Sequence, residues 1–527
     1  MAAHQFQARF EAAEIDKIFA GIDQCHLPGA AVGIAIDGVP VYRKGFGLAN
    51  MELPAPLTSA MRMRIGSTTK HFTALAYMLL CEEGLASLDD TIGKYVPGLR
   101  AATRDATIHQ LMGHTSGIRD AMAVTMLTNG VNLPVTDAQM IEYYRSIDSR
   151  DFEPGTHWSY NNGGYILLTA AIEKITGEPF ATVLRKRILE PAGLYDTMLR
   201  PWDSDFVPNS AALHVPGANG EWTRTYMGME ISGAGGMVST MDDMLSWMKQ
   251  MDHPVVGSSE TWRLMHEPHR LANGKSTGYG LGLMIGTYRG VPTIHHAGMV
   301  FGGNSQFIRV PEANLDISIA VNRGDLWAPA YANMIIDVCV EGLDPAFTSA
   351  SSEKALGTFV SQSGQRVVSL FSVGNMHLMS VDGGQAVPIT PVAEDVMHLD
   401  PTMDFMQQSA RIDGDAIVFS EFGMEETLSA IKPVMDVSLG GHAGSYRADT
   451  IDAIITVSEE AGGARATIQG RYGRTDYKLE PITPDIWRIE QCVRASLAAT
   501  VRFNVDGSGL SLNYPSGMRH ISLVRVD

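Results

Sequence analysis

The chain has 527 residues, which at roughly 100 to 200 residues per domain predicts about three domains rather than one. Hydrophobic residues make up 45% of the sequence and charged residues 19%, a composition that excludes a mostly disordered or collagen-like chain. The net charge of -18 makes nonspecific attraction to nucleic acid or to an anionic membrane surface unfavourable. We therefore expect neither nucleic acid nor a membrane as a partner.

The cysteines are few and scattered along the chain, namely Cys25, Cys81, Cys339 and Cys492. They form no Cys-x-x-Cys pair and no dense disulfide framework, which favours a reducing compartment. Residues 1–19 mix charged with apolar side chains and so lack the apolar core of a secretory signal. No apolar run approaches the roughly 20 residues of a membrane span. The sequence therefore predicts a soluble, cytoplasmic protein.

The first part of the chain alternates strand and helix patterns. Residues 31–36 and 39–42 are predicted to form a hairpin around an Asp-Gly turn. Residues 67–80 are predicted to form a buried helix, with a hydroxyl residue placed to cap it and Gly84 placed to end it. Further helices are predicted at 137–145, 164–175 and 242–251, and strands at 281–285, 306–310 and 316–322. This mixture indicates an α+β fold with helices packed against an antiparallel sheet.

The pattern changes at 346–352, where small and hydroxyl residues indicate a linker. Only short alternating segments follow, separated by Gly-Gly and Asp-Gly turns, which predicts two small antiparallel β-barrels. The expected strands include 367–371, 416–420, 451–457, 466–469 and 510–514. Breaks near 432–433 and 440–441 divide the barrels, so the predicted domains are 1–345, 346–435 and 436–527.

Ser67 and Lys70 are the first candidates for chemistry. Three residues apart on one helix, their side chains would share a face with Cβ atoms about 5 to 6 Å apart, as a nucleophile and its base require. Positive potential at the helix amino end would lower the pKa of Lys70, and the unpaired NH groups there would stabilise an oxyanion. Roughly one Ser-x-x-Lys is expected by chance in a chain of this length, so a solvated helix start is the alternative.

A second candidate segment, 158–164, forms a turn that leads into a helix. It leaves Tyr160 and Asn162 near the mouth of that helix, where Tyr160 could relay protons and Asn162 could bind an amide. An isolated tyrosine is more often a core aromatic whose hydroxyl is satisfied. The assignment of Tyr160 therefore depends on the groups that accompany it.

A third segment, 294–298, lies between strand-like stretches. The small residues Ala297 and Gly298 would let a substrate backbone lie against the strand. His295 and His296 are spaced poorly for binding one metal ion, and no third ligand follows the usual patterns. We therefore expect no metal site, and we interpret His295 as structural.

Ser-x-x-Lys at 67–70, Tyr-x-Asn at 160–162 and His-x-Gly at 296–298 occur in an order and spacing that resembles the serine β-lactamase and penicillin-binding protein superfamily. Similar signatures lie at Leu111–Ile118, Ser232–Gly236 and Tyr279–Leu283. Most penicillin-binding relatives carry Lys-Thr-Gly where this chain has His-x-Gly, and the histidine form resembles the branch that contains esterases and D-aminopeptidases. The resemblance implies a β-lactamase-like catalytic domain and makes classical penicillin hydrolysis a weaker expectation.

A catalytic block followed by two barrels resembles the D-stereospecific aminopeptidase group. In that group a loop of the last barrel reaches the active site, and an acidic residue on it helps to hold the free amine of the substrate. The equivalent stretch here is 491–500, which contains Arg494 and no carboxylate, with Glu490 only at its edge. Arg494 is therefore a candidate for binding a substrate carboxylate instead.

The resemblance also implies a mechanism without a cofactor. Ser67 would form an acyl-enzyme, Lys70 and Tyr160 would share the base and proton-relay work, and His296 would orient them. The backbone NH groups of Ser67 and Met299 would form the oxyanion hole.

In the same scheme Asn162 would hold the amide on the acyl side of the substrate. The expected substrate is a small peptide or amino-acid amide with a D-residue at its amino end. Relatives of this size are often dimers, so we expect a homodimer.

Three alternatives stay open at this point. The first is a promiscuous esterase or weak β-lactam hydrolase that uses the same Ser67 machinery. The second is a penicillin-recognising protein that acylates slowly and signals through its β domains. The third is a metallohydrolase that rests on His295 and His296.

Overall fold

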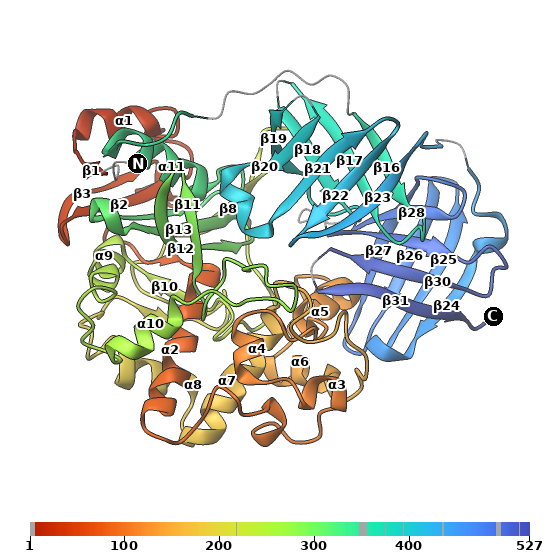
Figure 1. The fold of residues 1–527 in the computed structure, drawn as a ribbon, viewed down its shortest axis with the longest axis horizontal. Helices are drawn as coiled ribbons and strands as arrows, with labels where there is room; N and C mark the ends of the chain where they lie inside the picture. The colour runs from red at the N-terminus through yellow and green to blue at the C-terminus, as the bar shows by residue number, and fades with distance from the viewer. Residues whose placement is uncertain are drawn as a thin grey trace.

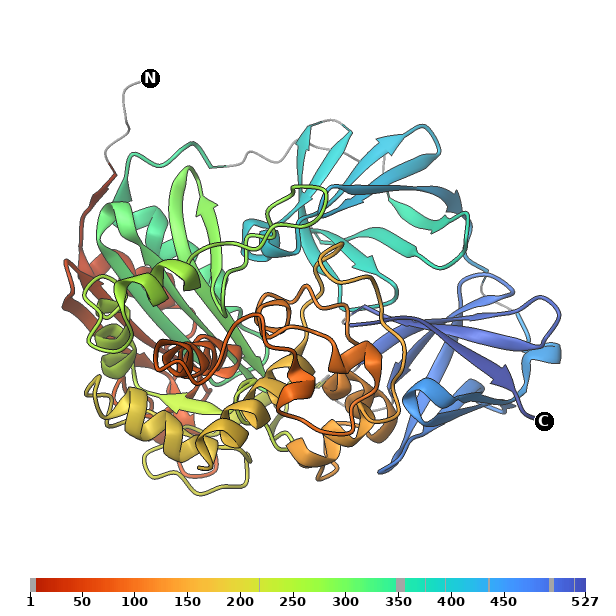
Figure 2. The same ribbon diagram turned by 60° about the horizontal axis from the view of Figure 1, so that its bottom comes forward.

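The computed structural model describes residues 6–217, 219–346, 356–374, 376–393, 395–434, 437–491, 497–515 and 517–527, without the side chains of residues 404 and 405. A sheet and its helices form one side of the molecule, and the two barrels lie side by side along the other (Figure 1). The helices α2 and α4–α8 lie below the sheet in Figure 1, and Figure 2 shows the same arrangement turned by 60° about the horizontal axis. Within the described residues, no helix is both long and apolar enough to cross a membrane.

The central sheet has six antiparallel strands in the order β11-β12-β13-β14-β2-β3. Its strands are β2 (Ala30–Ile36), β3 (Val39–Phe46), β11 (Met284–Tyr288), β12 (Val291–Val300), β13 (Gly303–Val310) and β14 (Leu315–Val321). Asp37 (φ 52°) and Gly38 (φ 69°) form the turn between β2 and β3, which confirms the predicted hairpin. β13 and β14 are buried along their whole length because helices cover both faces of the sheet.

The helices occupy the two faces of the sheet and the region below it. They are α1 (Ala12–Phe19), α2 (Thr69–Glu82), α3 (Ala101–Arg104), α4 (Ile108–Met112), α5 (Ala121–Asn129), α6 (Asp137–Tyr143), α7 (Asn162–Thr176), α8 (Phe180–Leu184), α9 (Met241–Lys249), α10 (Ser259–Met265) and α11 (Ala328–Cys339). α1 and α11 share one apolar core with the sheet. α9 packs against β2 and β14, while α2 packs against α7 and α10. The predicted α+β arrangement is therefore confirmed.

Small sheets complete residues 6–346, the part of the chain that precedes the barrels; it carries the three predicted motifs and is called the catalytic part below. They pair β1 (Gln7–Ala8) with β15 (Val340–Glu341), β4 (Leu48–Asn50) with β5 (Ala55–Pro56), β8 (Leu213–Pro216) with β9 (Trp222–Thr225), and β10 (Met237–Ser239) with both β6 (Met63–Arg64) and β7 (Met198–Leu199). β6 matters for the site because it leads directly into the turn that carries Ser67.

Two closed antiparallel barrels follow, as the sequence predicts. The first consists of β16 (Gly357–Ser361), β17 (Val367–Val373), β18 (Met376–Val381), β19 (Val387–Ala393), β20 (Val396–Leu399), β21 (Gln408–Asp413), β22 (Ala416–Glu421) and β23 (Met424–Ile431). The second consists of β24 (Gly444–Ala448), β25 (Ala453–Glu460), β26 (Gly463–Gln469), β27 (Arg474–Pro481), β28 (Ile486–Gln491), β29 (Ala498–Phe503), β30 (Gly509–Tyr514) and β31 (Met518–Arg525). The boundaries at 345/346 and 435/436 stay predictions.

The two barrels attach to the catalytic part differently. The interior of the second barrel is continuous with the apolar core of the helical region. The Tyr477 hydroxyl donates to the Leu127 carbonyl of α5 at 2.5 Å, and the Gln491 amide donates to the Met126 carbonyl at 2.9 Å. The first barrel instead has an apolar core of its own. The first barrel therefore contacts the catalytic part at its surface, and the apolar core of its interior does not extend into that part.

Three sequence-based details are wrong. No side chain caps α2, and its first turn is a 3-10 helix rather than the start of the α-helix. The strand predicted at 281–285 begins only at Met284, because Gly282 (φ 75°) bends the chain before it. The strand predicted from Ile451 begins at Ala453, because residues 449–451 form a 3-10 turn.

Candidate active site

Ser67 lies in a 3-10 turn, Gly66–Thr68, immediately before α2. Gly66 has a positive φ of 51°, and a Cβ atom there would come within 2.8 Å of the Met299 backbone nitrogen. The turn therefore lies directly against strand β12, and only glycine fits at its first position. Ser67 is half-buried, so its hydroxyl is reachable.

Lys70 is fully buried and its amine touches three oxygens. The Nζ atom lies 3.1 Å from the Ser67 Oγ, 2.8 Å from the Asn162 Oδ1 and 2.5 Å from the Ala234 carbonyl oxygen. The structure therefore places the Lys70 amine next to the Ser67 hydroxyl, as predicted, and Asn162 contacts the same amine.

Burial lowers the pKa of Lys70 from 10.5 to about 7, and the charge of Asp120 opposes this shift only in part. The sequence argument attributed such a shift to the helix amino end, whereas desolvation is the dominant cause. A substantial share of Lys70 is consequently neutral near pH 7.

The hydrogen-bond geometry assigns a role to that neutral amine. A neutral amine has two N–H donors and one lone pair. The Ala234 carbonyl and the Asn162 Oδ1 can only accept, so they take both donors. The lone pair is left for the Ser67 hydroxyl, which then donates to Nζ. This is the arrangement that removes a proton from a serine nucleophile.

Asp120 organises the helix end that carries Asn162. Its carboxylate accepts hydrogen bonds from the backbone NH groups of Asn162, Gly163 and Met122, each at 2.9 Å. It thereby joins the amino ends of α5 and α7, whose positive potential stabilises a buried carboxylate. The sequence analysis did not identify Asp120, although it lies only two residues after the Leu111–Ile118 signature.

Tyr160 lies beside the same amine. The Lys70 Nζ sits 4.8 Å from the centre of the Tyr160 ring. The Tyr160 hydroxyl is buried and has no hydrogen-bond partner within the described residues. Burial raises the pKa of Tyr160 well above its usual value, and the nearby Ser67 side chain only partly opposes this. The phenol therefore stays protonated, and its proton is available for transfer.

His296 faces the catalytic groups from strand β12. Its Nδ1 lies 2.6 Å from the Ala297 carbonyl oxygen, which can only accept, so Nδ1 carries the proton. Its Nε2 then accepts from the Tyr279 hydroxyl at 2.9 Å. Burial and the nearby Lys70 hold the pKa of His296 well below its usual value. His296 is therefore a neutral ring in one tautomer, suited to orienting neighbours rather than to taking a proton.

Gly298 and Met299 lie on the part of β12 nearest Ser67. A Cβ atom on Gly298 would meet the Ile65 carbonyl oxygen at 1.9 Å, so no other residue fits there. The Thr68 hydroxyl donates to the His296 carbonyl at 3.1 Å, which fixes the distance between the turn and the strand. The Met299 side chain is exposed.

His295 is not part of this cluster. His295 points away from His296, as alternation along a strand requires, so the two rings cannot share one ion. The described residues contain no group of three or more histidine, cysteine or carboxylate side chains placed to hold a metal ion. Arg494 lies outside the described residues.

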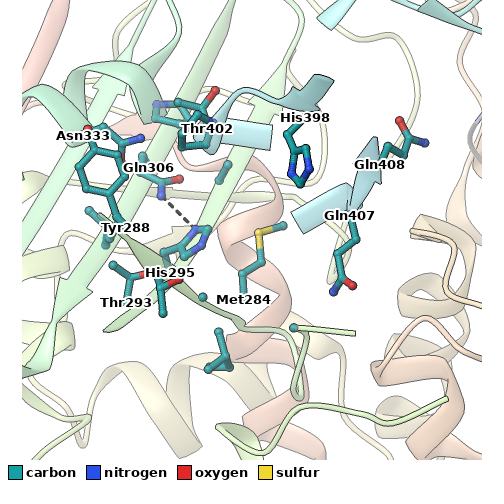
Figure 3. A pocket seen from close by; sticks show the side chains of 18 of the residues that line it. Met284, Tyr288, Thr293, His295, Gln306, Asn333, His398, Thr402, Gln407 and Gln408 are labelled. Atoms are coloured by element: carbon teal, nitrogen blue, oxygen red, sulfur yellow. Dashed lines mark hydrogen bonds between the residues drawn. The ribbon is translucent and has the colours of Figure 1, made fainter. Parts of the chain in front are cut away.

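His295 instead lines a pocket of about 370 Å³ between the sheet and the first barrel (Figure 3). Gln306 donates to its Nδ1 at 3.2 Å within that pocket. This pocket and the Ser67–Lys70 cluster therefore lie on opposite faces of β12.

The sequence analysis missed three further contributors: His114, Tyr279 and the Ala234 carbonyl. His114 is buried against the Tyr160 ring, with ring centres 4.5 Å apart, and its Nδ1 accepts from the Asn161 NH at 3.1 Å. Each of the three lies within a signature that the sequence displays, at 111–118, 279–283 and 232–236. A signature marks such a segment, but it does not reveal which atom points at the site.

Comparison with known proteins places this geometry in context. The family model described as Beta-lactamase matches residues 15–337, more than half of the chain. A D-aminopeptidase of Brucella anthropi is 26% identical over 474 residues, which cover 87% of this chain and 86% of that protein. A D-aminopeptidase of Brucella canis is 26% identical over 476 residues, which cover 87% of each chain.

Solved structures share the fold. The octameric penicillin-binding protein homologue from Pyrococcus abyssi has a TM-score of 0.59 and 22% identity, and the match covers 89% of this chain and 100% of that one. The D-amino acid amidase from Ochrobactrum anthropi SV3 has a TM-score of 0.52 and 21% identity, and the match covers 62% of this chain and 98% of that one.

Proposed function

Because the chain belongs to the beta-lactamase family of serine hydrolases, we propose that it hydrolyses small peptides or amino-acid amides with a D-residue at the amino end. The observation that carries the reaction class is the set of three contacts to the Lys70 amine. They leave its lone pair for the Ser67 hydroxyl. The D-specific part rests on the relatives that carry the name D-aminopeptidase.

Acylation proceeds in the following way. The Ser67 oxygen attacks the carbonyl carbon of the substrate while Lys70 accepts the serine proton. The carbonyl oxygen becomes an oxyanion, which the backbone NH groups of Ser67 and Met299 stabilise. As the C–N bond breaks, Tyr160 gives its proton to the leaving nitrogen and receives the proton held by Lys70. The products of this step are the free amine and an ester to Ser67.

Deacylation uses the same groups in reverse. A water molecule attacks the ester, and its proton passes through Tyr160 and Lys70 to the Ser67 oxygen as the ester bond breaks. The acid product leaves, and Ser67 is restored. Asn162 holds both the Lys70 amine and the amide on the acyl side of the substrate, and His296 keeps the aromatic groups in place.

The surroundings of the reaction are also proposals. We infer a reducing compartment, the cytoplasm, because the cysteines are scattered, and the three in the described residues are free: Cys25, Cys81 and Cys339. We infer a homodimer from the size of the chain and the number of its domains. Arg494 is the proposed contact for a substrate carboxylate.

Labelling with a fluorophosphonate probe tests the nucleophile. Wild type is expected to be labelled and Ser67→Ala is not, with turnover in the variant reduced roughly a thousandfold or more. Ser305→Ala is the matched control, since its hydroxyl donates to the Ile65 carbonyl at 2.8 Å rather than to any of the reacting groups. Label retained on Ser67→Ala would exclude Ser67 as the nucleophile.

The p-nitroanilides of D-Ala and L-Ala test the stereochemistry. We expect a higher kcat/KM for the D-substrate, because specificity is a difference in transition-state binding. Equal values would remove the D-peptidase assignment and leave the acyl-enzyme chemistry intact. Faster turnover of short esters or of nitrocefin would then favour the esterase or β-lactam alternative, and a burst without turnover would favour the slow acylator.

A further inference from the structure

The hairpin that joins β22 to β23 in the first barrel has an unusual turn. Glu421 pairs with Met424, so Phe422 and Gly423 are its two central residues. Their φ angles are 50° and 76°. Both values are positive, as in a type I′ turn, whose first position favours asparagine, aspartate or glycine. A bulky phenylalanine is sterically unfavourable in this left-handed conformation, so the turn alone does not explain why it is there.

The Phe422 side chain packs against the catalytic part of the molecule rather than into the interior of its own barrel. It is 1% exposed and is absent from the apolar core of the first barrel. Its ring packs 5.2 Å from the Trp158 ring and 5.7 Å from the His157 ring, measured between ring centres. It also forms an apolar cluster with Tyr279, against which Tyr160 packs. The first barrel therefore inserts one aromatic side chain beneath the segment that carries Tyr160.

Trp158 links Phe422 to the reactive groups. The centre of its ring lies 6.2 Å from that of Tyr160 and 5.9 Å from that of Tyr279. Tyr279 in turn donates to the Nε2 of His296 at 2.9 Å. One layer of aromatic rings thus separates Phe422 from both Tyr160 and His296.

The residue before Phe422 anchors the hairpin. Glu421 is buried, and its two carboxylate oxygens accept from the two terminal nitrogens of Arg519, in the second barrel, at 3.0 and 3.2 Å. It also accepts from Gln408 at 2.7 Å and lies 3.2 Å from the His157 ring. Burial opposes ionisation, but Arg519 and Arg366 outweigh it and hold the pKa of Glu421 well below its usual value. The ion pair therefore holds the hairpin of the first barrel against both the second barrel and the residue next to Trp158.

We propose that Phe422 is a positioning residue for the reaction at Ser67, through which the first barrel completes the active site. Its ring supports Trp158 from below and so holds Tyr160 within reach of Lys70 and Ser67. Without it, the Trp158–Tyr160 segment would have an unfilled space beneath it and Tyr160 would lose its fixed place. The proposal rests on the acyl-enzyme function of Ser67 proposed above.

The experiment compares Phe422→Ala with Phe359→Ala in the full-length protein. Phe359 is a buried aromatic in the interior of the same barrel, so its loss damages the barrel without touching the Trp158 segment. We expect Phe422→Ala to lower kcat and the rate of fluorophosphonate labelling at least roughly tenfold with KM changed less than about twofold. Phe359→Ala is expected to leave kcat and labelling within about twofold of wild type.

Phe422→Leu is the rescue variant because leucine refills the space with an apolar side chain. It is expected to return kcat to within about threefold of wild type. Circular dichroism and the melting temperature of each variant define an assay temperature at which all are folded.

Three results would overturn the proposal. They are unchanged labelling in Phe422→Ala, an equal loss in Phe359→Ala, and a Phe422→Leu variant as slow as Phe422→Ala. A failure of the proposed function would look different, since wild type itself would then fail to be labelled at Ser67. A failure of substrate specificity alone would leave labelling intact and the comparison of variants readable.

Discussion

The pH dependence of acylation follows directly from the burial of Lys70. A fall in the pKa of Lys70 from 10.5 to about 7 means that burial destabilises the ammonium by about 5 kcal/mol relative to the neutral amine. About one Lys70 in ten is then neutral at pH 6, and about nine in ten at pH 8. With an ordinary pKa, fewer than about one in a hundred would be neutral at pH 8. Because only the neutral amine can accept the Ser67 proton, acylation should accelerate about tenfold from pH 6 to pH 8 and then level off.

The assay is the rate of fluorophosphonate labelling of Ser67 across pH 5.5 to 10, since the probe has no ionisable group of its own. The rings that face Lys70 do not titrate in this range. The pKa values of His114 and His296 are well below their usual value, mainly because both rings are buried, and that of Tyr160 is well above its own. A labelling rate that stays flat from pH 6 to 8, or that keeps rising to pH 10, would refute the assignment of Lys70 as the base.

Two variants identify the titrating group. Burial also raises the pKa of Asp137 to about 7, and Asp137 accepts a hydrogen bond from the Ser232 hydroxyl, two residues before the Ala234 carbonyl. Asp137→Asn should keep the profile if Lys70 is responsible and abolish it if Asp137 is. Asp120→Asn should move the profile to lower pH, because the Asp120 charge raises the pKa of Lys70.

Three further predictions concern single groups. Tyr160→Phe should lower kcat roughly a hundredfold or more, and an activity near wild type would exclude Tyr160 as the proton donor. Thermal stability should not fall, because the hydroxyl that is removed has no hydrogen-bond partner in the described part of the chain. Tyr279→Phe removes the donor to His296 and should lower kcat by about tenfold in steady-state kinetics. His296→Gln in the same background should then lower kcat little further, and full additivity of the two losses would contradict the coupling between Tyr279 and His296. Thr136→Ala removes the side chain that accepts from the Gln139 NH at 3.1 Å and should weaken the first turn of α6 by about 1 kcal/mol. Amide exchange in that turn should become roughly fivefold faster with kcat unchanged, and unaltered exchange would show that the cap does not stabilise α6.

The two barrels meet the part of the chain that carries Ser67 in different ways. The second barrel shares its core with the helical region and anchors α5, while the first makes local contacts, among them the Phe422 ring beside Trp158 and the Gln407 amide that donates to the Ser276 carbonyl at 3.0 Å. Arg519 connects them by contacting both Glu421 and the segment that includes Asp151, whose carboxylate accepts from the Arg519 NH at 2.9 Å. On the proposed role of Phe422, we expect substitutions at this junction to affect the position of Tyr160.

Much of the site could be predicted from the sequence because part of it is local. Ser67 and Lys70 lie one turn apart on a continuous stretch, so helical geometry alone brings them together. The two barrels could be predicted for a similar reason, since each short strand shows alternating apolar and polar residues and is bounded by turn residues. The hairpin at 31–42 also depends only on its own turn.

The cause of the Lys70 pKa could not be predicted in this way. The sequence suggests a helix dipole, but the observed shift comes from complete burial beneath Asn162 and the 232–236 loop. Burial is a sum over residues that are distant in the chain, and no local pattern reports it. The contact between Phe422 and Trp158 could not be predicted either, because the sequence around Phe422 and Gly423 indicates only a hairpin turn and not what its ring packs against.

The amino-acid sequence by itself determined the pairing of Ser67 with Lys70 on one turn, the order of the three motifs and the all-β character of the last third of the chain. The tertiary structure alone decided that Asn162 and the Ala234 carbonyl take both donors of the amine, that the Ala297 carbonyl and the Tyr279 hydroxyl fix one tautomer of His296, and that the Phe422 ring packs against Trp158. The physical reason is that spacing along a chain controls contacts within one or two turns. Hydrogen-bond direction and desolvation depend instead on groups that only folding brings within a few ångströms of each other.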